Sequence, residues 1–484
     1  MVLRFYNTYS NKLETFKPIR NREVGLYTCG PTVYDYIHLG NARTFLLEDL
    51  LRRYLEYSGY KVKQVMNITD VGHLTQDEIE SGEDKLEVAA KKKKKTPKEI
   101  ASFYEKDFFE QIKKLNFKKA YKYPRATDHI KDMQDWIKKL QKNGLAYEKN
   151  GSVYFDIASF KKYGKLSGNT LSKLKEGKSG RKLDNTDKKN FYDFALWVND
   201  AEHLMSWPSP WCKKGYPGWH LECSVMATKY LGKQFDIHMG GEDNIFPHHE
   251  AEIAQAEGVT GKKWVNYWIH PRHLMVDGGK MSKRDGNFYT PEDIYKKGFS
   301  PRQLRFFLIS THYRKKLNFT FDALEASNKS LQKLITFIDD LKNASGRSAK
   351  DYKKLDLDAA LSNLRVQFTL HMNRDLNISG ALAVIFTFVT KINKHMRAGY
   401  ISQVDAKKII AQLKKFDKVL AVLFWKDNDE LSAEVKKLIQ QRDEARKNKD
   451  WTASDKIRDE LKAKGIELKD VDGKTKVVIK FKVK

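Results

Sequence analysis

Apolar and polar residues near the start of the chain follow a strand, helix, strand order. Val24–Thr28 is a short apolar run that predicts a buried strand, and the sequence Cys-Gly-Pro-Thr at 29–32 ends it. From Asn41 apolar residues recur at helical spacing until Gly59, which predicts a helix, and Lys61–Asn67 predicts a second strand. This order predicts a parallel βαβ unit and therefore a Rossmann-like sheet that binds a nucleotide.

The middle of the chain interrupts the sheet pattern. Residues from about 120 to 205 are polar, rich in lysine and broken by glycine-containing loops, so we expect an insertion within the sheet domain. The pattern resumes with a strand at Phe235–Met239, a helix over Pro247–Glu257 and a strand near Trp264–Ile269. These elements would complete the sheet.

The last third of the chain is predicted to be helical. After about Phe321, apolar residues recur at helical spacing, as in Leu361–Phe368 and Leu382–Ile392, which predicts a helical bundle. Val477–Lys484 alternates in part between apolar and polar residues, which is typical of an edge strand.

Composition narrows the class of protein. The chain has 484 residues, which predicts about three domains, and 40% of them are hydrophobic, too many for a wholly disordered protein. Three cysteines cannot hold a fold of this size together, which excludes a disulfide-built secreted protein. The longest apolar stretch, Ala381–Val389, is far shorter than the ~20 residues of a membrane-spanning helix. We expect a soluble protein of a reducing compartment, without a secretory signal.

The net charge of +28 leaves two interpretations open. Phosphates attract lysine and arginine whatever their sequence, so the surplus favours a polyanionic partner such as a nucleic acid. A general bias toward lysine explains the same surplus. The run Lys91–Lys95 predicts a solvated loop or helix face rather than a specific site.

Two short motifs have the chemistry of phosphate binding. His38, Gly40 and Asn41 stand at the predicted turn from strand to helix, where free backbone N–H groups and the helix dipole favour an anion. Lys280 and Lys283 stand in a glycine-flanked loop that would carry positive charge to a polyphosphate. Taken singly, the first motif is more typical of a core or capping histidine, and the second also fits a solvated basic loop.

A third set of residues has the donor chemistry of a metal site. Cys29, Cys223, His248 and Glu252 offer two thiols, an imidazole and a carboxylate, an acceptable tetrahedral set for zinc. His248 and Glu252 are four residues apart, so both side chains face the same side of one helix. The spacing between the two cysteines is too long for a zinc finger, so the pattern alone also allows buried structural cysteines.

The two phosphate motifs together resemble the paired signatures of class I aminoacyl-tRNA synthetases. Asn41 stands where the common form has a second histidine, and Arg284 replaces a terminal serine. The resemblance becomes specific in Cys-Gly-Pro-Thr-Val-Tyr-Asp at 29–35, Pro-Gly-Trp-His-x-Glu-Cys-Ser at 217–224 and Phe-Pro-His-His-Glu-x-Glu at 246–252. These segments are similar to those of the cysteinyl-tRNA synthetase family, and the likeness extends over essentially the whole chain.

The resemblance implies roles for particular residues. One Zn²⁺ per chain would be held by Cys29, Cys223, His248 and Glu252, while Cys212 matches no family position and would be structural. The implied catalytic residues are His38, Asn41, Lys280 and Lys283, and the implied ATP-binding residues are these four with Gly40, Gly240, Gly241 and Asp243. The implied contacts to the substrate cysteine are Gly30, Thr69, Trp219 and His238, and those to tRNA are Arg442, Arg446, Lys449, Trp451 and Asp455. Trp451 would either stack on an unpaired base or cap a small core.

The implied fold is α/β. A Rossmann-like parallel sheet forms a catalytic domain over 1–320 that holds the inserted connective region, about 120–205, and the Lys-Met-Ser-Lys loop with a stem-contact region, about 271–320. An α-helical bundle at 321–425 and a small anticodon-recognition domain at 426–484 follow it. The segment from Val71 to Glu83 departs from the family pattern, so we assign it no role.

The implied activity is a ligase reaction that joins L-cysteine to tRNA(Cys) through cysteinyl-adenylate, with ATP as substrate and Mg²⁺. Serine is nearly isosteric with cysteine, and a pocket gains only ~1–3 kcal/mol from small differences in bulk. A zinc ion would instead recognise the sulfur, because a thiolate forms and binds zinc far more readily than a hydroxyl. We expect a cytoplasmic monomer with no membrane partner.

Two alternatives remain at this point. A mycothiol-type cysteine ligase shares the catalytic half but should lack the anticodon-like region at 440–473. A non-catalytic, zinc-stabilised RNA-binding protein would fit the charge and the cysteine–histidine set, but it leaves the paired phosphate motifs without a function.

Overall fold

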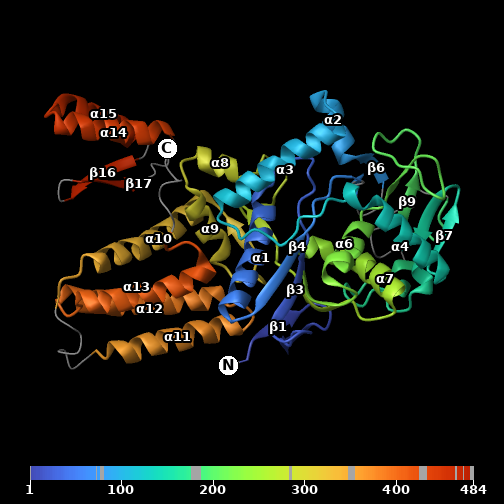
Figure 1. The fold of residues 1–484 in the computed structure, drawn as a ribbon, viewed down its shortest axis with the longest axis horizontal. Coiled ribbons are helices and arrows are strands. Elements are labelled where there is room, and N and C mark those ends of the chain that lie inside the picture. Colours follow the sequence, from blue (N-terminus) through green and yellow to red (C-terminus); the bar gives the residue numbers. More distant parts are fainter. Residues whose placement is uncertain are drawn as a thin grey trace.

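The computed structural model describes most of the chain. The described residues are 2–71, 74–76, 81–175, 187–282, 286–346, 355–424, 433–463, 466–471 and 474–479. Figure 1 shows an α/β domain with an antiparallel lobe at one side, a bundle of long helices at the other, and a small C-terminal unit of two helices and two strands. The predicted fold class is confirmed.

A four-stranded parallel sheet forms the centre of the α/β domain. Its order is β12, β11, β3, β4, and every neighbouring pair is parallel. The strands are β3 (Glu23–Thr28), β4 (Lys61–Met66), β11 (Phe235–Met239) and β12 (Val265–Ile269). The predicted strands are confirmed within one residue at each end, because their apolar runs are buried from both faces of the sheet.

Helices connect these strands as a βαβ topology requires. Helix α1 (Leu39–Tyr57) links β3 to β4, and it ends before Gly59, whose φ of +89° suits a glycine. Helix α6 (Leu221–Leu231) precedes β11, and α7 (His248–Thr260) links β11 to β12. A short antiparallel hairpin, β1 (Arg4–Asn7) and β2 (Lys12–Thr15), stands before the sheet.

The segment between β4 and β11 holds the inserted lobe. Its four-stranded antiparallel sheet has the order β10, β9, β8, β7. The lobe's elements are α4 (Ile130–Lys142), β7 (Ala146–Lys149), β8 (Ser152–Phe155), α5 (Leu171–Lys175), β9 (Phe194–Asn199) and β10 (Gly215–Pro217). Four elements between β4 and the lobe precede it: β5 (Leu74–Gln76), β6 (Ser81–Asp84), α2 (Lys85–Lys93) and α3 (Pro97–Lys114). The buried residues of α2 and α3 pack in the same core as α1. The predicted limit of 205 is too early, because β10 pairs with β9 and so belongs to the same sheet.

A three-stranded sheet and two short helices follow β12. The strands are β13 (Leu274–Val276), β14 (Gly279–Lys280) and β15 (Leu317–Phe319), and the helices are α8 (Pro291–Lys296) and α9 (Pro301–Ile309). The buried guanidinium of Arg43 on α1 donates 2.8 Å hydrogen bonds to the carbonyl oxygens of Arg272 and His273. The helix that begins at the His38 motif is thereby joined to the region that carries Lys280.

The predicted bundle consists of four helices, α10 (Phe321–Lys342), α11 (Leu357–Asn373), α12 (Ile378–Arg397) and α13 (Gln403–Leu420). Their apolar faces are continuous with the core under the parallel sheet, so the bundle and the α/β domain share one hydrophobic core. No helix in the described parts of the chain has the length and apolar character needed to cross a membrane.

The C-terminal unit contains α14 (Ala433–Lys447), α15 (Trp451–Ala463) and an antiparallel pair, β16 (Ile466–Val471) and β17 (Lys474–Ile479). Leu461 is the centre of its small core. The predicted edge strand Val477–Lys484 is partly right: β17 begins three residues earlier, and residues 480–484 lie outside the described residues.

Candidate metal centre and nucleotide site

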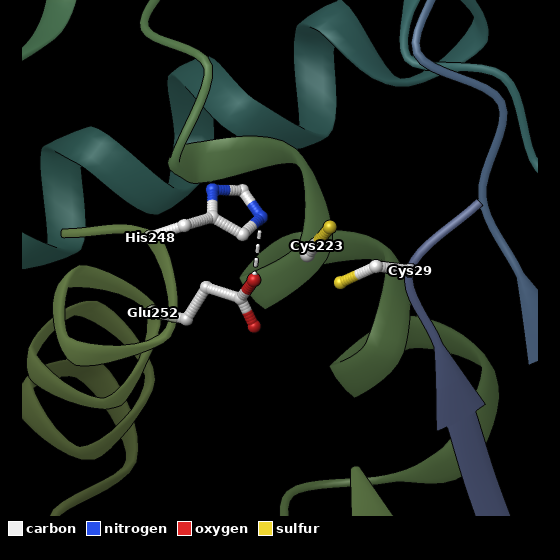
Figure 2. Close-up of side chains that lie close together, drawn as sticks. All are labelled: Cys29, Cys223, His248 and Glu252. Atoms are coloured by element: carbon white, nitrogen blue, oxygen red, sulfur yellow. Dashed lines mark ion pairs between the residues drawn. The ribbon is translucent and has the colours of Figure 1, made fainter. Parts of the chain in front are cut away.

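Four side chains that the sequence predicts as metal ligands lie together at the carboxyl end of the parallel sheet. Cys29 directly follows β3, Cys223 lies on α6, and His248 and Glu252 lie on α7. Figure 2 shows the four side chains pointing toward one another. One donor atom from each lies within 4.8 Å of the others, and all four residues are buried. Three segments far apart in the sequence therefore build one donor set.

The chemistry of this donor set fits a zinc ion. Two thiols, an imidazole and a carboxylate are ligands that zinc takes in tetrahedral sites. Both cysteines are free thiols. Glu252 Oε1 is buried without a hydrogen bond, although it lies only 2.8 Å from His248 Nε2. An imidazole nitrogen and a carboxylate oxygen this close together can bind the same ion.

The protonation of the two thiols also depends on a cation. Burial is the main cause that raises the pKa of Cys223 well above its ordinary value, followed by its contacts with Cys29 and Glu252. A hydrogen bond with Cys223 lowers the pKa of Cys29. Burial and the charge of Glu252 raise this pKa by more, so that it is about 11. Because thiolates are the form that binds metals, a positive ion among these groups is what would deprotonate them.

Two further histidines surround the donor set. His238 Nε2 lies 2.7 Å from Glu252 Oε2, and His249 Nε2 lies 3.2 Å from Cys29 Sγ. Together with Cys29 and Glu252, these two histidines form a second set whose donor atoms lie within 4.8 Å of one another. His249 Nδ1, however, lies 2.8 Å from His270 Nε2, so both of its ring nitrogens have protein partners. The set with two thiols suits zinc better, which leaves His238 and His249 as hydrogen-bond partners of the ligands.

Two of the residues predicted to contact the substrate cysteine touch the predicted metal ligands. The indole of Trp219 stacks on the imidazole of His248, with ring centroids 4.2 Å apart, and is partly exposed. His238 is fully buried against Glu252. Trp219 therefore contacts the predicted ligand His248 with part of its ring exposed, whereas His238 contacts the predicted ligand Glu252.

The other two predicted cysteine contacts belong to a polar network. The backbone N–H of Gly30 donates to Asn67 Oδ1, and the hydroxyl of Thr69 donates a 2.7 Å hydrogen bond to Glu222. A Cβ on Gly30 would lie 1.9 Å from the Asn67 carbonyl oxygen, so only glycine fits there. Glu222 is fully buried, and the sequence prediction missed it although it precedes Cys223 in the quoted motif.

The His38 motif caps helix α1. His38 Nδ1 accepts a hydrogen bond from the backbone N–H of Asn41, and Asn41 Oδ1 accepts one from the backbone N–H of His38. The capping interpretation of His38 is therefore correct for one of its ring nitrogens. Because Nδ1 accepts, the proton of the neutral ring is at Nε2, the atom that would donate to a phosphate. Asn41 therefore completes the helix cap, because its side chain accepts the hydrogen bond from the His38 backbone.

The basic loop lies against the start of α1. Lys280 is exposed at the end of β14, and Met281 Cε lies 3.5 Å from the position that a Cβ on Gly40 would take. The backbone N–H of Ser282 donates a 2.7 Å hydrogen bond to Asn287 Oδ1, which closes the loop. The predicted residue Lys283, like Arg284, lies outside the described residues.

Asp243 lies between the two phosphate motifs. A hydrogen bond with His273 is the main cause that lowers the pKa of Asp243, and the charges of Lys280 and His38 lower it further. The predicted Gly240 is required sterically, because a Cβ there would lie 2.8 Å from the ring of His249. At Gly241, by contrast, the nearest atom to such a Cβ is 3.9 Å away, at Thr44 Oγ1.

The predicted tRNA contacts on the C-terminal unit divide into two groups. Trp451 is 57% exposed, with the Arg446 guanidinium 5.8 Å from its ring centroid, and Lys449 and Asp455 are also exposed. Trp451 therefore does not cap the small core. The prediction for Arg442 is wrong: this side chain is 1% exposed, so its guanidinium cannot reach an RNA phosphate.

Three family models match parts of the chain. Residues 15–329 match the tRNA synthetases class I (C) catalytic domain, residues 367–424 match the DALR domain, and residues 428–477 match the cysteinyl-tRNA ligase anticodon binding domain.

Relatives and solved structures agree with these models. A cysteine–tRNA ligase of Brachyspira hyodysenteriae is 43% identical over 474 residues, covering 96% of this chain and 97% of that protein. A cysteine–tRNA ligase of Thermococcus onnurineus is 41% identical over 97% of this chain and 98% of its own length. The structure of Mycobacterium tuberculosis methionyl-tRNA synthetase with methionyl-adenylate has a TM-score of 0.58 at 14% identity, over 83% of this chain and 90% of that one. That last likeness concerns the fold alone.

Proposed function

The chain belongs to the family of cysteine–tRNA ligases among the class I aminoacyl-tRNA synthetases, and on that premise we propose how its own residues select and activate cysteine. The enzyme is a ligase that activates L-cysteine with ATP and attaches it to tRNA. The C-terminal match to an anticodon binding domain argues against the mycothiol-type alternative, and the catalytic domain argues against a purely RNA-binding protein.

The proposal for cysteine selection rests on one observation: four buried donor groups, from the residue after β3 and from α6 and α7, lie within 4.8 Å of one another. We propose that Cys29, Cys223, His248 and Glu252 hold one zinc ion. When bound, the ion would accept the substrate thiolate as an additional ligand and so separate cysteine from serine, whose hydroxyl hardly ionises.

The protein side chains around the ion would orient the rest of the amino acid. Trp219 covers His248 and would form a wall against the substrate side chain. The hydroxyl of Thr69 donates to Glu222 and accepts a hydrogen bond from Asn67 Nδ2, and its second lone pair would accept a hydrogen bond from the substrate ammonium. Gly30 would allow the substrate to approach the backbone closely, since a side chain there has no space.

Activation needs no protein nucleophile. The cysteine carboxylate attacks the α-phosphate of ATP, and the enzyme contributes by positioning the groups and stabilising the developing charge. We propose that His38 Nε2 and the start of α1 bind the phosphates, with Gly40 giving access to the backbone. Lys280 and Lys283 would stabilise the leaving pyrophosphate, and Mg²⁺ bound with ATP would supply further positive charge.

The ATP ribose and adenine are proposed to bind at the Gly240–Asp243 turn. This turn follows β11 at the carboxyl end of the sheet, where nucleotides bind in doubly wound folds. Asp243 lies close to Lys280 and His38, as its lowered pKa indicates.

We propose that the exposed residues of the C-terminal unit contact the tRNA. The exposed indole of Trp451 suits stacking on an unpaired base, and Arg446 and Lys449 suit phosphate contacts. Asp455 lies on the same helix as Trp451. The proposed domains are 1–320, 321–425 and 426–484. We propose that the enzyme acts as a monomer in the cytoplasm.

One assay tests the proposed function. ATP-dependent charging of tRNA with labelled cysteine is measured on the enzyme as isolated, after chelation of zinc, and after zinc is returned. We expect chelation to abolish charging and zinc to restore it, while serine is not charged under any condition. Full charging by the metal-free enzyme would refute the zinc proposal without refuting the activity.

A further inference from the structure

An exposed cluster of aromatic rings lies beside the proposed site, outside every role described so far. Tyr36 and Phe103 are 42% and 46% exposed, and their ring centroids lie 6.2 Å apart in an edge-to-face arrangement. The buried ring of Tyr104 supports both, with centroids at 5.0 Å from Tyr36 and 5.1 Å from Phe103. Packing against Tyr104 fixes the two rings, which remain partly exposed.

Lysines flank these rings. The ammonium of Lys93 lies 5.5 Å from the ring centroid of Phe103 and 5.9 Å from that of Tyr36, and Lys95 Nζ lies 5.8 Å from Phe103. Both belong to the run Lys91–Lys95, which is exposed at the C-terminal end of α2, as the sequence predicts. Tyr36, Phe103, Lys93 and Lys95 are called the aromatic–lysine surface below.

The chain connects this surface directly to the site. Tyr36 lies in the loop between β3 and α1, which begins at the proposed metal ligand Cys29 and ends at the helix cap His38. Tyr36 and His38 are two residues apart, so their Cα atoms are at most about 7 Å apart. Phe103 lies on α3, which packs against α2. The surface is therefore at the edge of the place where the adenylate would form.

We propose that the aromatic–lysine surface binds the unpaired 3′ end of the tRNA as it enters the site, an inference that rests on the proposed function. Single-stranded RNA is bound by stacking its bases on exposed rings and by pairing its phosphates with cations, and this surface offers both within 6 Å. A paired stem would expose no base faces to these rings. The terminal ribose must reach the adenylate, and this surface adjoins it.

Phe103→Ala tests the proposal because Phe103 contacts neither phosphate motif nor donor set. Binding is measured for intact tRNA and for tRNA that lacks its unpaired 3′ nucleotides. We expect the variant to weaken binding of intact tRNA by about 5- to 150-fold and to leave truncated tRNA unchanged. Phe103→Trp should restore binding, since the indole provides an equal stacking face. Cysteine-dependent ATP–pyrophosphate exchange, which needs no tRNA, should stay at the wild-type rate.

Tyr121→Ala is the matched control. Tyr121 is 63% exposed with the Lys63 ammonium 4.5 Å from its ring centroid, but it lies beside β4 and not on the loop from Cys29 to His38. The Tyr121→Ala variant should bind both tRNAs with the affinity of the wild type. The proposal is overturned if Phe103→Ala weakens the binding of both tRNAs equally or weakens the binding of neither. A loss of ATP–pyrophosphate exchange in this variant also overturns it. A wild-type enzyme that charges no tRNA with cysteine would instead refute the proposed function.

Discussion

The imidazole of His249 lies with its Nε2 3.2 Å from the Sγ of Cys29, and its Nδ1 lies 2.8 Å from Nε2 of His270. Both histidines are buried. A hydrogen bond to a ligand fixes the orientation of that ligand and stabilises its charged form. The position of Cys29 therefore depends on a side chain that is not itself one of the four proposed ligands.

Replacing this histidine should weaken metal binding without removing a ligand. We expect His249→Leu to lower zinc affinity by ~10–100-fold, as measured by competition with a chromophoric chelator. His129→Leu is the control, because His129 is also a buried histidine but bonds to Arg125 and Tyr230, away from the donor set. Equal zinc affinity of His249→Leu and the wild type would show that the contact with Cys29 has no role in metal binding.

The two functions of His38 can be separated by substitution. Asparagine is as good a helix cap as any residue but lacks the imidazole Nε2. We expect His38→Asn to keep thermal stability close to that of the wild type while it slows ATP–pyrophosphate exchange by ~10²-fold or more. His38→Ala should lose the cap as well, at a cost of about 1 kcal/mol. A normal exchange rate in His38→Asn would leave capping as the only role of this histidine.

The basic loop should act on the reaction and not on amino-acid binding. Lys280 is exposed, its charge acts on Asp243, and it is not one of the donor residues. We expect Lys280→Ala and Lys283→Ala to slow adenylate formation by ~10²–10³-fold with an unchanged KM for cysteine. Lys316→Ala, which removes another exposed lysine of the same region, should exchange at the wild-type rate. A raised KM for cysteine with normal turnover would contradict this assignment.

The sequence predicts the features of the fold that depend on neighbouring residues, such as buried strands and helix faces. The apolar runs of β3 and β11 specify buried parallel strands, and the four-residue spacing of His248 and Glu252 places both on one face of α7. The strand β10 could not be predicted, because Gly-Tyr-Pro has no alternation and becomes a strand through its pairing with β9. The contact of His249 with Cys29 joins residues 220 apart, and only the tertiary structure brings them together.

A buried histidine makes the attachment of α2 dependent on pH. His203 lies 3.2 Å from Glu87 Oε1 and 3.5 Å from Asp84 Oδ2, where Asp84 is the N-cap of α2. Burial lowers the pKa of His203, but the hydrogen bond with Asp84 and the charge of Glu87 outweigh it, so the pKa is raised overall.

A raised pKa stabilises the folded state below the unfolded value of about 6.5, and this stabilisation is lost as pH rises through the folded pKa. We expect amide hydrogens of α2 to be protected more in the wild type than in His203→Gln at pH 6, with a smaller difference at pH 8.5. Hydrogen exchange with mass spectrometry measures this. A difference that does not shrink with pH would mean that His203 acts through packing on Tyr216 alone.

Trp451 and Arg442 should respond to substitution in opposite ways, although the sequence predicts the same role for both. Trp451 is exposed and Arg442 is buried in the same C-terminal unit. We expect Trp451→Ala to lower kcat/KM for tRNA by about 5- to 150-fold, the effect of one lost stacking contact, with no change in protection of α14 or α15 from hydrogen exchange. Arg442→Leu should destabilise the unit by about 1–3 kcal/mol, visible as faster exchange in both helices. Because neither residue lies near the donor set, both variants should keep normal ATP–pyrophosphate exchange, so a loss of exchange in either would contradict the separation of anticodon binding from cysteine activation.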